Sequence, residues 1–247
     1  MGFFSGLCGL VGGALSALGS AVCSVGSALG SAIGCAVSAI GGALSSVLQS
    51  SLLLQKLLPV LAVVIPPPLD AIAVVAIEVL SATLGKPEKP EELGWQMNKA
   101  DKKPDDFDSF DEYKEYLDRE YPFDRDAFDA QTDEQKMANR YIGIAGTMQE
   151  LKEAKDFELN PQSLGTLCGM ASRLGWNETT IRDFTHGMVS SLGSPSLGAL
   201  EGALADGLKA GNVSDSLNAV KTAFAEASAQ VDEGMAIARP VLEGNEE

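Results

Sequence analysis

The sequence has few residues of the kinds that carry enzyme chemistry. Of its 247 residues four are cysteines and only one, His186, is a histidine. No C-x-x-C pair occurs, so the ligand sets of ordinary zinc sites are missing, and so is a phosphate-binding loop. The acidic run 106–131 lacks the spacing and the glycine of a calcium loop. We therefore expect no enzyme, no catalytic residue, no cofactor and no metal site.

Charge is almost absent from the first third of the chain. Residues 1–55 contain no charged residue, and residues 1–85 contain only Lys56, Asp70 and Glu78. The other 162 residues contain 17 basic and 32 acidic residues. An acidic region of this kind is repelled by nucleic acid and by anionic lipid headgroups. The chain thus joins a membrane-like part to a water-like part, and we expect no nucleic-acid partner.

The N-terminus lacks the features of a secretory signal peptide. No basic region precedes the apolar residues, and the apolar region is several times longer than that of a signal peptide. We expect synthesis in the cytoplasm without a classical signal peptide, followed by action at a membrane, including that of a target cell.

His186 is expected to be a partly exposed structural residue on a helix, with pH sensing as the alternative.

An eleven-residue repeat fills most of the segment 1–50. The blocks 18–28 and 29–39, LGSAVCSVGSA and LGSAIGCAVSA, show it most clearly. Large apolar residues recur about every 3.6 residues, which predicts an α-helix and excludes a strand. The repeats would extend for about 66 Å, twice a bilayer core of about 30 Å. A hairpin that turns near Leu29 is therefore the alternative to one long helix.

The predicted helix has one ridge of large residues and other faces of small ones. The ridge is expected to face lipid or a partner and includes Leu18, Val22, Leu29 and Ile33. Glycines spaced four residues apart form rows that let helices approach closely in lipid. The residues expected to pack helix on helix are Gly9, Gly13, Gly26, Gly30, Gly34 and Gly42. This pattern favours self-association.

A second apolar block, residues 51–85, is interrupted by the prolines 66–68 and predicts a helix, a break and a helix. Each arm is short for a complete membrane span. Asp70 and Glu78 lie near one face of the second arm, and acids in a membrane segment often mark an ion pathway. They are therefore candidate pore acids. The alternative is that this arm lies at an interface or packs on the soluble domain, with both acids in water.

The rest of the sequence predicts a polar linker, residues 86–106, and an acidic α-helical domain, residues 107–247. Helix-start signals occur at Thr132, Asn160, Asn177, Ser194 and Ser214, and Gly175 and Gly211 are expected to end helices. No strand pattern is present. The predicted fold is therefore all-α, with a long glycine-zipper hydrophobic helix or hairpin joined to an acidic α-helical bundle.

The row Gly26, Gly30 and Gly34 resembles the glycine zippers of pore-forming antibacterial toxins, and among these the membrane-targeting effectors delivered by type VI secretion. The resemblance covers roughly residues 7–50 and lies in the motif. It implies insertion into the inner membrane of a target cell, assembly of several copies and ion leakage. A chaperone, a delivery machine and an immunity protein are the further partners that this resemblance suggests.

Three functions fit these patterns. The first is a membrane-inserting, self-associating protein that permeabilises a target membrane, either as a pore-forming effector or as a protein ejected by a phage or injection machine. The alternatives are a structural protein that assembles through its repeat helix into a filament or shell, and a membrane-anchored scaffold whose acidic bundle binds a partner. The first requires the ridge to face acyl chains, so the expected partners are the lipid bilayer and other copies of the chain.

Overall fold

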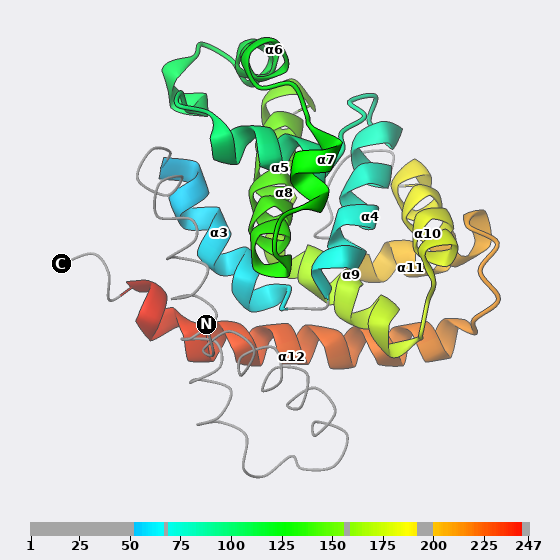
Figure 1. The fold of residues 1–247 in the computed structure, drawn as a ribbon. Coiled ribbons are helices and arrows are strands. Elements are labelled where there is room, and N and C mark those ends of the chain that lie inside the picture. The colour runs from blue at the N-terminus through cyan, green and yellow to red at the C-terminus, as the bar shows by residue number, and fades with distance from the viewer. Residues whose placement is uncertain (1–51, 67–68, 156–158, 192–199, 244–247) are drawn as a thin grey trace.

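The computed structural model describes residues 52–66, 69–155, 159–191 and 200–243 (Figure 1). The α-helices in these ranges are α3 (Leu52–Val64), α4 (Leu69–Thr83), α5 (Pro90–Lys99), α6 (Phe110–Glu120), α7 (Arg125–Asp129), α8 (Asp133–Lys155), α9 (Pro161–Arg173), α10 (Glu178–Ser191), α11 (Leu200–Ala210) and α12 (Leu217–Glu243). A short 3-10 helix, Pro104–Asp106, precedes α6, and the described residues form no strand. The predicted all-α class is confirmed. The repeat segment 1–50, with its zipper glycines and apolar ridge, lies outside the described residues.

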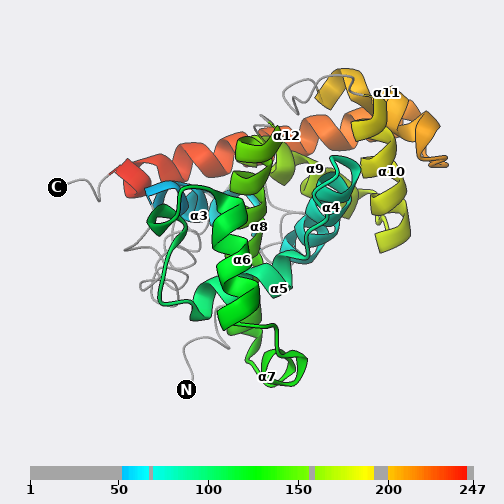
Figure 2. The same ribbon diagram turned by 90° about the horizontal axis from the view of Figure 1, so that it is seen from above.

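Helix α8 is at the centre of the helical body. It contacts α3, α4, α5 and α6. Helix α12 runs beneath α3 and α9 in Figure 1 and contacts both, while α10 contacts α4 and α11. Seen from above, α12 lies along one side of the body and α8 extends away from it (Figure 2). One hydrophobic core contains residues from α3 through α12, so the apolar helices α3 and α4 belong to the same packed unit as the acidic helices.

Side-chain caps begin three helices where the sequence predicts them. At the start of α8, the Thr132 N–H donates to Gln135 Oε1 at 3.0 Å and the Gln135 N–H donates to Thr132 Oγ1 at 3.3 Å, which is a capping box. The side chains of Asn160 and Asn177 accept from first-turn N–H groups of α9 and α10. Short-range sequence signals therefore fix these helix starts.

The start of α12 differs from the prediction. Ser216 caps this helix by accepting from a first-turn N–H at 3.2 Å, two residues after the predicted start at Ser214. Asp215 lies between Ser214 and Ser216, and its side chain accepts a hydrogen bond from Trp176 in another loop. This bond holds the segment before Ser216 against that loop.

The start predicted at Ser194 lies outside the described residues. Gly175, which follows α9 as predicted, has a φ of 64° that favours glycine.

Residues 86–106 are not the polar linker that the sequence predicted. They contain α5, and its residues Leu93, Trp95 and Met97 are buried against the rest of the body. Pro90 occupies the first position of this helix, where its missing N–H leaves no helical hydrogen bond unmade. Pro90 thus begins a core helix inside the segment that was predicted to be a linker.

Two glycines let α5 and α8 approach each other backbone to backbone. A Cβ atom at Gly94 would lie 1.8 Å from the carbonyl oxygen of Asn139, and one at Gly143 would lie 1.7 Å from the carbonyl oxygen of Pro90. No side chain has room at either position. The contact between α5 and α8 therefore requires glycine on both helices.

We expect Gly143→Ala to lower the free energy of unfolding by about 1–3 kcal/mol, because the added methyl group overpacks the α5–α8 contact. Gly234→Ala in α12 is the matched control. A Cβ there would lie 3.7 Å from Val63 Cγ1, an ordinary contact, and alanine favours a helix interior by up to about 1 kcal/mol. Urea denaturation of the full chain measures both effects. Equal stability of the two variants would contradict the close approach.

Candidate functional site

The candidate site consists of the apolar pair α3–α4 and the polar contacts that hold this pair in the body. Leu61, Ile65 and Ile77 from this part of the chain are completely buried. Apolar side chains also occupy positions that are only partly buried, such as Val60 of α3 and Val75 of α4. These partly buried apolar side chains also pack against the core.

Among the described residues, no single helix is both long enough and apolar enough to cross a bilayer. The helical segments Leu57–Val64 and Leu69–Thr83 meet the criteria of length and composition only as a pair, and they are bent by 117° relative to each other. A buried core helix of a soluble protein has the same composition, so the polar contacts of the pair become informative.

Asp70, one of the two predicted pore acids, lies in the first turn of α4 and is 4% exposed. Arg140 of α8 donates from Nη1 to Asp70 Oδ2 at 2.8 Å and from Nε to Glu91 Oε1 at 2.7 Å. Burial opposes the charge of Arg140, but the bonds to the two carboxylates outweigh it and raise the arginine pKa. The alternative interpretation, in which this arm packs on the body with both acids in water, is thus wrong for Asp70, which is buried in an ion pair.

Glu78, the second predicted pore acid, is partly exposed and is paired with α10. Arg182 donates from Nη2 to Glu78 Oε2 at 2.7 Å and from Nε to Glu178 Oε1 at 2.9 Å. The bonds to these carboxylates raise the pKa of Arg182. Each acid of α4 therefore shares an arginine with a second carboxylate from elsewhere in the body. A role of Asp70 and Glu78 in a pore stays a prediction.

A buried tyrosine holds the end of α3. The hydroxyl of Tyr141 donates to the carbonyl oxygen of Ile65, and burial raises the pKa of this tyrosine well above its ordinary value. Gly165 of α9 packs on the same turn, since a Cβ there would lie 2.5 Å from the Val64 carbonyl oxygen.

Cys168, one turn further along α9, is fully buried, and burial raises its pKa. A thiol in this environment is inert and serves packing.

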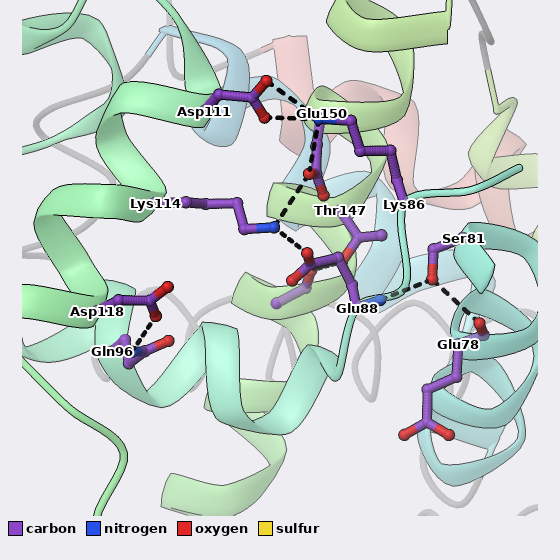
Figure 3. Close-up of polar contacts among 11 residues, drawn as sticks. Glu78, Ser81, Lys86, Glu88, Gln96, Asp111, Lys114, Asp118, Thr147 and Glu150 are labelled. Carbon is purple, nitrogen blue, oxygen red and sulfur yellow. Dashed lines mark hydrogen bonds and ion pairs between the residues drawn. The ribbon is translucent and has the colours of Figure 1, made fainter.

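A cluster of lysines and carboxylates ties the segment after α4 to α6 and α8 (Figure 3). The side chain of Glu150 in α8 is 1% exposed; its Oε1 accepts from Lys114 Nζ at 3.1 Å and lies 3.8 Å from Lys86 Nζ. Lys114 also pairs with Glu88, and Lys86 pairs with Asp111 at 2.7 Å. One buried carboxylate therefore connects three segments of the chain.

Burial affects the charged groups of this cluster in different ways. It raises the pKa of Glu88, and although the hydrogen bond from Lys114 acts in the opposite direction, the nearby Glu150 adds to the rise. Burial also opposes the charge of Lys114, but the bonds to Glu88 and Glu150 outweigh it and raise the lysine pKa. Folding therefore raises the pKa of both Glu88 and Lys114 relative to the unfolded chain.

The raised pKa of Glu88 predicts a dependence of stability on pH. The folded chain binds the Glu88 proton more tightly than the unfolded chain, whose value is near 4.5. The contribution of this group to stability is therefore complete below the unfolded pKa and is lost as pH rises through the folded pKa. We expect Glu88→Gln to remove this decline and to be at least as stable as the wild type near neutral pH. Urea denaturation across the acidic to neutral range measures it, and an unchanged pH profile would contradict it.

Arg140→Met tests the pairing of Asp70. The variant leaves a buried carboxylate without its cation, so we expect the free energy of unfolding to fall by about 3–5 kcal/mol. Adding Asp70→Asn should restore part of this loss, because no unpaired charge then remains in the core. Lys89→Met is the control, since Lys89 pairs with Glu92 at 3.0 Å but its side chain is 69% exposed, and such pairs contribute less than about 1 kcal/mol. Equal losses in Arg140→Met and Lys89→Met would contradict the assignment.

Outside the pair α3–α4, the described residues include a histidine, side chains of the types that bind metal ions, and a surface hollow. His186 is exposed on α10. No group of three or more His, Cys, Asp or Glu side chains in the described ranges is placed to hold a metal ion. A polar hollow of about 320 Å³ lies between the loops 174–177 and 211–215. Trp176 Nε1 donates to Asp215 Oδ2 at 2.7 Å across these loops.

Sequence reasoning missed Arg140, Arg182, Lys114 and Glu150. Arg140 is 70 positions from Asp70, and Arg182 is 104 positions from Glu78; no local pattern identifies partners at such separations. A signal was nevertheless present for Arg140, because it interrupts the run MANRYIGIAG in a helix whose neighbouring residues are apolar. A charge among residues of a core helix is almost never buried without a partner.

Comparisons with known proteins found no relative. No protein-family model matches the chain, and no curated protein and no solved structure was found to match it. The function proposed below is therefore inferred from the chain itself.

Proposed function

We propose that this protein inserts into a lipid bilayer, associates with other copies of itself there and permeabilises the membrane. The observation that carries the proposal is the junction at the start of α3. Residues 1–51 contain no charge, and in the sequence they immediately precede α3, a core helix of the charged body. A segment of bilayer-like composition is thus attached to a folded domain without a charged linker.

The composition of residues 1–50 supports lipid as their environment. Each glycine weakens a helix in water by about 1 kcal/mol relative to alanine, so this segment would be a poor helix there. In lipid an unsatisfied backbone group is so unfavourable that a glycine-rich segment still forms a helix. The row Gly26, Gly30 and Gly34 then allows close approach between copies, which is the main source of helix association in a bilayer.

In this proposal the acidic body stays on the aqueous side of the membrane. Its excess of acidic residues is repelled by anionic headgroups, so contact with lipid is left to the apolar residues. The membrane is that of a target cell, and the partners are the lipid bilayer, other copies of the chain, and a chaperone, delivery machine or immunity protein that handles the apolar segment before insertion.

Leakage of dye from phosphatidylcholine vesicles tests this function. We expect the full chain to release the dye and a variant without residues 1–50 to release none. Gly30→Leu should reduce leakage at least tenfold, because it fills the row through which copies approach. Ser31→Leu is the matched control: it adds the same apolar side chain at the next position, outside the row, and should retain leakage.

Three outcomes would contradict the proposal or a part of it. Leakage that persists without residues 1–50 would show that this segment is not required. An absence of leakage together with large, stable particles in lipid-free solution would favour assembly into a filament or shell. Equal effects of Gly30→Leu and Ser31→Leu would argue against association through the glycine row.

A further inference from the structure

We propose that the pair α3–α4 is a second membrane-entering element, stored in the water-soluble body, and that Asp70 and Glu78 hold it there. The surface that receives the pair is a phospholipid bilayer. This inference rests on the proposed function, because it assigns to the same protein a second segment that reaches the membrane after residues 1–50.

The positions of α4 that are not fully buried are mostly apolar. They include Ala71, which is exposed, and Ile72 and Val75, which are partly buried and pack against the core; Glu78 and Thr83 are the polar ones. In α6, by contrast, exposed positions carry acids such as Asp111 and Glu112. A helix that only fills a core needs apolar residues on its buried face, whereas a helix that also enters lipid needs them on the remaining sides.

The lengths of α3 and α4 and the bend between them suit entry into a single leaflet. Helices α3 and α4 have 13 and 15 residues, or about 20 and 22 Å, so neither crosses a hydrocarbon core of about 30 Å. Their bend of 117° suits a pair that enters one leaflet and leaves on the same side. The three prolines 66–68 at the bend have no N–H groups, so fewer backbone donors are left unsatisfied in lipid.

Two ion pairs join α4 to other helices of the body. Arg140 and Arg182 come from α8 and α10 and bind the only two acids of α4. These pairs favour the stored position in two ways. They attach α4 to the body, and they give its two carboxylates a cation that a lipid environment does not supply. Neutral side chains at positions 70 and 78 remove both effects, whereas loss of the arginines removes the attachment but leaves the carboxylates in place.

The test compares two double variants that each remove one carboxylate from both arginines. Asp70→Asn with Glu78→Gln changes acids of α4, whereas Glu91→Gln with Glu178→Gln changes the second partner of each arginine and leaves α4 intact. A fluorophore on Ala71→Cys, in a chain with Cys8, Cys23 and Cys35 replaced by alanine, reports contact with lipid through quenching by brominated phosphatidylcholine.

We expect quenching to rise several-fold in the α4 double variant and to match the parent chain in the control. Arg140→Met with Arg182→Met should give a smaller rise, because the charged acids still oppose entry. Gly143→Ala controls for destabilisation alone, since it weakens the α5–α8 contact without altering α4. Equal quenching in the α4 variant and in either the Glu91/Glu178 or the Gly143→Ala control would overturn the inference. Leakage that depends on residues 1–50, measured on the same samples, reports separately on the proposed function.

Discussion

A carboxylate buried in an apolar core needs a cation beside it, and this requirement organises the centre of the helical body. Asp70 is almost fully buried in α4, so Arg140 must reach it from α8. Glu78 is partly exposed, and Arg182 of α10 pairs with it. The two pairs set the rotation of α4 about its own axis, and α4 in turn places α8 and α10 on two of its sides.

The local elements of this fold could be predicted from the sequence, because their causes are local. The capping box at Thr132 and the caps at Asn160 and Asn177 involve residues two or three positions apart. The error at residues 86–106 has a comparable origin: proline suits both a loop and the first position of a helix. Only the burial of Trp95 and its neighbours, a tertiary property, decides between the two at α5.

The candidate site could be predicted only in part. Asp70 and Glu78 were identifiable because acids are rare in the apolar third of the chain, but their arginine partners come from distant helices and have no local signature. The same applies to Glu150, whose importance follows from the two lysines that converge on it. Burial of a charge is decided by all the helices around it, so one segment cannot reveal it.

The two apolar segments of the chain differ in a way that bears on their roles. Residues 1–50 are rich in glycine, alanine and serine, so they expose little area to bury and would add little to a core in water. Helices α3 and α4 carry leucine, isoleucine and valine, and their large side chains form the centre of the folded body. Removing this pair therefore sacrifices much of the core. The apolar contacts of the core therefore retain the pair in the body together with the two arginines that bind α4.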